Sequence, residues 1–200
     1  MSHYFINDRN LKTAIQTLNY DFLGHKMEFK TDSGVFSRAR IDFGTNLLLS
    51  ALAGESLDGK AFLDLGCGYG IIGLALAKAF PNAKVEMVDV LDRAIELSKS
   101  NAELNGLKNV NPHHSDLFSS VDSSFDVIVS NPPIRAGKET VHGIVTSALS
   151  HLETGGALWM VIQKKQGADS LLRKMETTFG NARVAEKKNG YQVLTCLKND

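Results

Sequence analysis

The chain has 200 residues, of which 43% are hydrophobic and 22% charged, so it is long enough to bury a sizeable core as one domain. Its 22 basic and 22 acidic residues give a formal net charge of zero, so an overall basic field that would attract nucleic acid is absent. No apolar run approaches the roughly 20 residues of a membrane span, and residues 1–4 do not open like a signal peptide. The two cysteines, Cys67 and Cys196, lack the spacing of metal ligands, so we expect a reduced cytoplasmic protein with no metal site and no membrane association.

Residues 1–34 predict a small N-terminal extension made of strands. Residues 20–30 read as two short strands about a turn at Gly24, and the second strand alternates polar and apolar side chains. The sequence Thr-Asp-Ser-Gly at residues 31–34 then predicts a turn. We therefore expect a hairpin ahead of the main domain.

The segment that follows places aromatic and basic side chains directly before a helix. Phe36 and Arg38 either cover a ligand site and touch a phosphate, or act only as an aromatic staple and a solvated charge. Asp42 or Thr45 would cap the helix, whose apolar face lies within residues 47–52. The sequence leaves both interpretations of Phe36 and Arg38 open.

Residues 61–80 are the stretch around which the chain is organised: an apolar run, a glycine cluster and an alanine-rich run at helical spacing. This pattern predicts a strand, a tight turn and a helix whose N-terminal amides face a ligand. The glycines of residues 68–73, with Asp89 at the expected distance, match a dinucleotide fingerprint. The glycines of residues 66–70, preceded by Asp64, instead match the pattern for S-adenosylmethionine (SAM). The glycines alone do not decide between the two cofactors.

Strands and helices alternate over the rest of the chain. This alternation predicts right-handed βαβ units in an α/β fold with a mainly parallel, doubly wound sheet. An Asn-Gly turn closes a final hairpin, which we expect to add an antiparallel edge strand. The predicted strands are residues 84–90, 109–113, 125–130 and 157–163, the helices about 92–104, 139–152 and 167–179, and the hairpin 182–187 with 191–197.

Four polar residues each follow a successive strand of the predicted sheet. They are Asp64, Asp89, Asp116 and Asn131. Since ligands of an open α/β sheet bind outside the carboxyl ends of its strands, we expect these four side chains to surround one site.

The three carboxylates suit the parts of a nucleoside cofactor. Asp64 can accept from a cationic group and would repel a pyrophosphate, or it only braces its own loop. Asp89 can accept from both ribose hydroxyls, unless it caps the next helix, a role that Asp92 fills better. Asp116 and Leu117 suit the amine and the ring of adenine, or they form a solvated loop.

The sequence Asn131-Pro132-Pro133 is the most informative motif. Prolines lack an amide hydrogen and hold the preceding residue extended, so two in a row fix a rigid corner. The Asn131 side-chain oxygen and the Pro132 carbonyl then converge as two acceptors, which suits both hydrogens of a planar amine. The alternative interpretation of this motif is a rigid loop that binds no ligand. Arg135 and Lys138, just beyond the corner, would meet a substrate phosphate at the mouth of the site.

Together, these motifs resemble one known family. They are similar to those of class I SAM-dependent methyltransferases of the small methyltransferase domain family, which includes bacterial ribosomal RNA guanine-N2 methyltransferases. The resemblance implies one domain over residues 1–200, with a Rossmann-like seven-stranded sheet of order 3-2-1-4-5-7-6, strand 7 antiparallel, and helices on both faces. The residues that carry it are Asp64-Leu65-Gly66-Cys67-Gly68-Tyr69-Gly70, Asp89, Asp116 and Asn131-Pro132-Pro133-Ile134.

The resemblance also implies which residues hold the cofactor and the substrate. Adenine-N6 and glutamine-N5 enzymes of this type usually have an aromatic residue where Ile134 stands, which favours guanine. The target amine would be held by Asn131, Pro132, Pro133 and Ile134, and the rest of the substrate by Phe36, Arg38, Arg135 and Lys138. The cofactor would be held by Asp64, Gly66, Cys67, Gly68, Tyr69, Gly70, Asp89, Val90, Asp116, Leu117 and Asn131.

We therefore expect a SAM-dependent methyltransferase that acts on an exocyclic amine of RNA, foremost guanine N2 of ribosomal RNA, as a monomer or a homodimer. The alternative methyl acceptors are a protein glutamine, adenine N6 or a small molecule. A more distant alternative is an NAD-dependent oxidoreductase, which the dinucleotide fingerprint would support.

Overall fold

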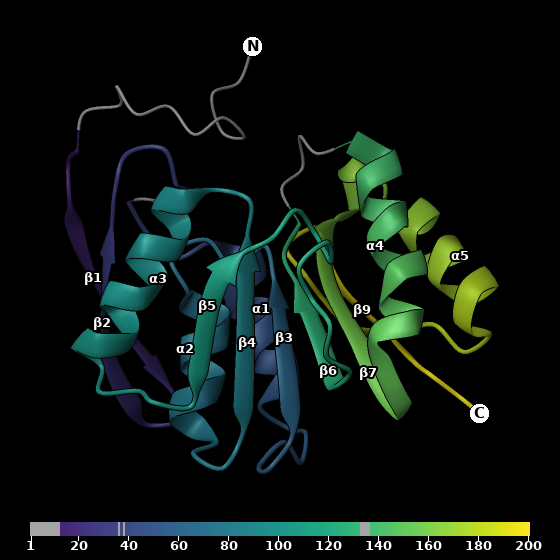
Figure 1. Cartoon of the computed structure of the whole chain (residues 1–200). Coiled ribbons are helices and arrows are strands. Elements are labelled where there is room, and N and C mark those ends of the chain that lie inside the picture. The colour runs from purple at the N-terminus through teal and green to yellow at the C-terminus, as the bar shows by residue number, and fades with distance from the viewer. Residues whose placement is uncertain (1–12, 36, 38, 133–136) are drawn as a thin grey trace.

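A computed structural model of the chain describes residues 13–35, 37, 39–132 and 137–200 (Figure 1). Its main feature is a seven-stranded sheet with the strand order β5-β4-β3-β6-β7-β9-β8. Counted from β3, this is the order 3-2-1-4-5-7-6, so the predicted α/β fold and its topology are confirmed. The strands are β3 Ala61–Leu65, β4 Lys84–Asp89, β5 Val110–His114, β6 Phe125–Ser130, β7 Leu152–Gln163, β8 Arg183–Lys188 and β9 Tyr191–Leu197.

The antiparallel strand of this sheet is β9, which pairs with β7 on one side and with β8 on the other. The expectation of an antiparallel edge strand is wrong in position, since β9 lies inside the sheet and β8, which runs parallel to β7, forms the edge. Val193 and Leu194 of β9 are fully buried, whereas most residues of β8 are exposed. The more apolar strand of the hairpin, β9, is therefore the one with a neighbouring strand at each edge.

Helices cover both faces of the sheet. Successive strand residues alternate between two apolar clusters, as Phe62 and Leu63 of β3 do, because the side chains of a strand point to opposite faces. Within the ranges that the structure describes, no helix is long and apolar enough to cross a membrane. One cluster includes α1 (Phe43–Leu52), α2 (Ile71–Ala79) and α3 (Asp92–Leu104), the other α4 (Gly137–His151) and α5 (Ala168–Phe179), and a short 3₁₀ helix, η3 (Lys164–Gln166), precedes α5.

The N-terminal hairpin consists of β1 (Gln16–Phe22) and β2 (His25–Thr31), and it lies beside α3 (Figure 1). Asn101 of α3 and Asn105, which caps the C-terminus of this helix, bond to the backbone of β2. Asn101 Oδ1 accepts from the Lys30 amide at 2.8 Å, and Asn101 Nδ2 donates to the Lys30 carbonyl at 2.9 Å. Asn105 pairs with the backbone of Glu28 in the same way. These bonds fasten the hairpin to the helix that covers the sheet.

Strand β7 begins at Leu152, earlier than the predicted strand at residues 157–163. The strand is irregular there, opposite Phe125 of β6. A Cβ on Gly156 would lie 2.8 Å from the carbonyl oxygen of Glu153 and 2.9 Å from that of Phe125. Glycine is therefore needed here for the close approach of the two strands.

Candidate active site

The glycine turn after β3 contains two pairs of glycines with different surroundings. Gly66 and Gly68 have φ angles of 78° and 57°, and a Cβ on either would meet no atom within 4 Å. A Cβ on Gly70 or Gly73 would instead lie 2.9 Å from a neighbouring side chain. The first pair therefore leaves open space beside the turn for a ligand, and the second pair allows α2 to pack closely.

Asp64 lies in the centre of the sheet next to this turn and is fully buried. Its Oδ2 accepts a hydrogen bond from the Gly73 amide at 2.8 Å, while its Oδ1 has no partner among the described residues. Burial raises the pKa of Asp64 to about 7; the Gly73 bond opposes this shift, and the charge of Asp89 adds to it. A buried, unpaired carboxylate oxygen fits a positively charged ligand group and does not fit a pyrophosphate.

Asp89 ends β4 and binds two backbone amides. Its Oδ2 accepts from the Gly68 amide and its Oδ1 from the Leu91 amide, both at 2.9 Å. Burial raises the pKa of Asp89, and these bonds oppose the shift. Each oxygen keeps a further lone pair, so ribose hydroxyls can still bind. The prediction that Asp92 caps α3 is wrong: the N-cap is Leu91, and Asp92 is the first helical residue.

Asp116 and Leu117 follow β5 at the same edge of the sheet. The Asp116 side chain is exposed, and Leu117 has a φ of 51°, which costs a non-glycine residue about 1 kcal/mol. Ser115 Oγ holds this conformation by donating to the Leu117 carbonyl at 2.8 Å. Val90 lies nearby, with its carbonyl oxygen 3.1 Å from His114 Nε2. The backbone of this loop is thus held in a defined conformation beside the end of β4.

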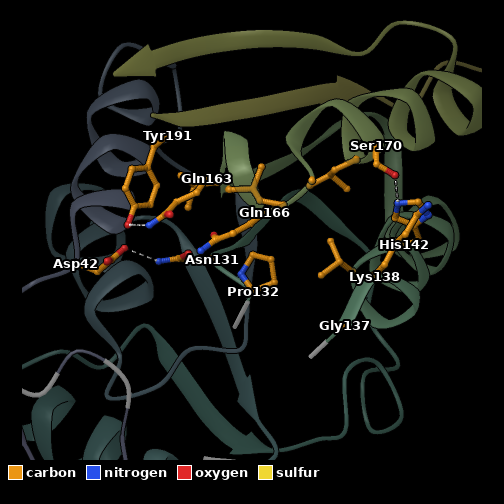
Figure 2. A pocket seen from close by; sticks show the side chains of 15 residues that line it. Asp42, Asn131, Pro132, Gly137, Lys138, His142, Gln163, Gln166, Ser170 and Tyr191 are labelled. Atoms are coloured by element: carbon orange, nitrogen blue, oxygen red, sulfur yellow. Dashed lines mark hydrogen bonds between the residues drawn. The ribbon is translucent and has the colours of Figure 1, made fainter. Parts of the chain in front are cut away.

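Asn131 follows β6 and contacts the start of α1, which the sequence did not predict. Its Nδ2 donates to Asp42 Oδ2 at 3.2 Å (Figure 2). The same nitrogen donates to Thr45 Oγ1 at 3.0 Å. Asp42 is also the N-cap of α1, accepting from the amides of Gly44 and Thr45. The predicted cap is thus correct for Asp42, and the second role of this residue was missed because 89 positions separate it from Asn131.

A pocket of about 140 Å³ adjoins Asn131 and Pro132, between the end of β7 and the first turns of α4 and α5. Lys138, which the sequence predicted at the mouth of a substrate site, lies in its wall. Burial, followed by the charges of Lys138 and Lys174, lowers the pKa of His142 in the same wall. Sequence reasoning missed the other polar side chains, because they come from separate elements; they are His142, Gln163, Gln166, Ser170 and Tyr191 (Figure 2).

Four of these polar groups form two pairs in the pocket wall. Gln163 Nε2 donates to the Tyr191 hydroxyl at 2.5 Å, and His142 Nε2 lies 3.3 Å from Ser170 Oγ. The Tyr191 ring packs against Phe43 with a centroid distance of 5.4 Å. The pocket therefore has preformed hydrogen-bonding groups beside an aromatic ring.

The side chains of Cys67 and Tyr69 point into the core, although both residues belong to the glycine turn. Tyr69 packs edge-on against Phe29 with a centroid distance of 6.1 Å, and Cys67 Sγ lies 3.7 Å from Ser98 Oγ. Burial raises the pKa of the Cys67 thiol, so it is not a nucleophile. The predicted site residues Phe36, Arg38, Pro133, Ile134 and Arg135 lie outside the described residues.

The glycine turn and the buried carboxylate of Asp64 thus suit a nucleoside that carries a positive charge. The antiparallel strand β9 lies between β7 and β8, which is the place expected for it in the strand order 3-2-1-4-5-7-6. This fold and site define a SAM-dependent methyltransferase domain. The chain belongs to the methyltransferase small domain family, whose family model matches residues 26–195. These findings favour SAM over the dinucleotide that the glycine spacing also allowed.

Three relatives place the chain within this family. An uncharacterised protein of Bacillus subtilis, YbxB, is 46% identical over 198 residues and matches 98% of each chain. Ribosomal RNA small subunit methyltransferase C of Vibrio cholerae is 33% identical over 89% of this chain and 52% of its own. The 16S rRNA N2 guanosine methyltransferase RsmC of T. thermophilus, solved with AdoMet and guanosine, superimposes with a TM-score of 0.83 and 29% identity, covering 92% of this chain and 51% of that one. The chain spans about half the length of these two rRNA methyltransferases.

Proposed function

We propose that the protein transfers a methyl group from SAM to the exocyclic N2 amine of a guanine in ribosomal RNA. The observation that carries this proposal is the orientation of Asn131, whose side-chain nitrogen is bonded to Asp42 and Thr45 and whose oxygen is left to accept from a substrate N–H. The names of two relatives support the choice of rRNA and of guanine N2.

The cofactor side of the site is assigned to the ends of β3, β4 and β5. Asp64 and the amides of the glycine turn would hold the charged methionine part, Asp89 the ribose, and Asp116 with Leu117 the adenine. Bound SAM supplies an electrophilic methyl group on a sulfonium ion. The unpaired Oδ1 of Asp64 is the feature that best fits this cation.

The chemistry at the amine requires positioning more than acid–base catalysis. Asn131 Oδ1 and the Pro132 carbonyl would accept the two N–H groups, which aligns the nitrogen lone pair for an in-line displacement. The proton can leave to water after the transfer, so no side chain has to act as a strong base. A base within a duplex must first be unstacked to reach the pocket beside Asn131.

The test is the Asn131→Ala variant. We expect calorimetric SAM affinity to stay within about twofold and methyl transfer to rRNA to fall by about 1,000-fold, since one half of the amine clamp is removed. Mass spectrometry of the digested product should show N2-methylguanosine with the wild-type enzyme. Undiminished transfer by the variant would contradict the proposal, as would labelling confined to a protein or a small-molecule fraction.

A further inference from the structure

The carboxamide of Asn131 has no hydrogen left for a substrate. Its nitrogen carries two hydrogens, and two acceptors lie within bonding distance: Asp42 Oδ2 at 3.2 Å and Thr45 Oγ1 at 3.0 Å. Thr45 is 3% exposed, and it comes from the same helical turn that Asp42 caps. The geometry therefore leaves the carboxamide oxygen as the group that this side chain can offer.

The reverse orientation of the carboxamide is unfavourable on chemical grounds. A flip would place Asn131 Oδ1 against the Asp42 carboxylate, where two acceptors would face each other without a proton between them. The helix start supports this arrangement, because Asp42 Oδ2 already accepts from the amides of Gly44 and Thr45 at 2.8 and 3.2 Å and cannot easily turn away.

We propose that Asp42 and Thr45 are positioning residues that lock Asn131 as a hydrogen-bond acceptor, so that the site admits a methyl acceptor only when it presents an N–H donor. This inference rests on the proposed amine methylation. It assigns the choice between donor and acceptor substrates to the N-cap and the first turn of α1, 89 and 86 positions before Asn131 in the chain.

The charge of Asp42 adds an electrostatic effect to this geometric one. A carboxylate that accepts from Nδ2 polarises the carboxamide and makes its oxygen a stronger acceptor. During the transfer, the amine nitrogen gains positive charge while it is bonded to that oxygen. A negative charge that accepts from the nitrogen of this carboxamide therefore stabilises the transition state more than the ground state.

Two conservative variants separate these effects from folding. Asp42→Asn keeps a good helix cap and the side-chain shape but removes the charge and allows the Asn131 carboxamide to flip. Thr45→Val keeps the shape and removes the acceptor, and Thr45→Ser is the matched control that keeps the hydroxyl. Circular dichroism melting curves establish that each variant is folded.

We expect kcat for rRNA methylation to fall by about tenfold in Asp42→Asn and about fivefold in Thr45→Val, because each acts through Asn131 instead of touching the reacting nitrogen. The KM for RNA and the affinity for SAM should stay within about twofold, and Thr45→Ser should resemble the wild type. An unchanged kcat in Asp42→Asn would overturn the inference. A raised KM with an unchanged kcat would also overturn it, by making Asp42 a substrate contact.

A second readout does not depend on activity. The Asn131 side-chain NH₂ signals in a ¹⁵N-labelled NMR spectrum can be assigned from their loss in Asn131→Ala. We expect both signals to shift in Asp42→Asn and in Thr45→Val, and to stay in place in Thr45→Ser. Unmoved signals in the first two variants would overturn the inference. If the wild type methylates no RNA, the proposed function fails, while these signals still test the lock.

Discussion

The two halves of the site are built in different ways. On the cofactor side, the bonds of Asp64 to Gly73 and of Asp89 to Gly68 join residues 9 and 21 positions apart, within one βαβ unit. On the proposed substrate side, Asn131 bonds to Asp42 and Thr45, which lie 89 and 86 positions earlier in the chain. A local loop leaves a recognisable motif in the sequence, whereas a surface assembled from distant elements does not.

The two halves also differ in charge. The cofactor side carries the carboxylates of Asp64, Asp89 and Asp116, which suit a cation. The wall of the proposed substrate pocket instead contains one lysine, Lys138, and one carboxylate, Asp42, beside His142. Burial and the neighbouring lysines lower the pKa of His142, so this imidazole stays neutral to lower pH. The excess of carboxylates on the proposed cofactor side suits a positively charged methyl donor.

The largest effect that separates the two halves is expected at Asp64. Its pKa of about 7 lies above its usual value of 3.8, so between these values the folded protein binds more protons than the unfolded chain. The free energy of unfolding of the cofactor-free protein should therefore decrease as pH rises from about 4 to about 7. Calorimetric melting should show this decrease in the wild type and not in Asp64→Asn, with the exposed Asp122→Asn as the control.

The same carboxylate should control SAM affinity. A cationic ligand favours ionised Asp64, so SAM affinity should increase over the same pH window, and Asp64→Asn should weaken SAM binding by about 100-fold. Titration calorimetry measures both. SAM affinity that is the same in the variant and the wild type would show that the cofactor side does not depend on this charge.

A smaller effect is expected at Gly44, on the substrate side. A Cβ there would lie 2.8 Å from Asp42 Oδ2 and 3.0 Å from the Tyr191 ring, so Gly44→Ala should displace the Asp42 carboxylate by a few tenths of an ångström. We expect kcat to fall by about fivefold with SAM affinity unchanged, since small misplacements near the reacting atoms are costly. Gly143→Ala on α4 is the matched control, because its Cβ would meet open space. Equal kcat values for the two variants would contradict this account.

The smallest effect is expected at Lys138. If this side chain meets an RNA phosphate at the pocket wall, Lys138→Ala should raise the KM for RNA by about threefold at low salt and reduce the salt dependence by about one phosphate contact. The exposed Lys99 on α3 provides the control substitution to Ala. A KM that rises equally in both variants would indicate a general loss of positive charge.

Much of the fold could be predicted because it depends on local patterns. Alternating strands and helices predicted the parallel sheet, and the Asn-Gly turn predicted the β8–β9 hairpin. The errors occurred where a local signal had a long-range cause. The start of β7 was predicted at residue 157, but the strand begins at Leu152, because Gly156 lets it approach β6 closely. Asp92 was interpreted as the cap of α3, but the N-cap is Leu91.

The sequence by itself determined the strand–turn–helix unit and the carboxylates at successive strand ends, and it singled out the Asn-Pro-Pro motif, because each is encoded by neighbouring residues. The tertiary structure alone decided that Asp42 and Thr45 meet Asn131 and that Gln163 pairs with Tyr191. These contacts form only when the crossover connections bring distant strand ends to one edge of the sheet.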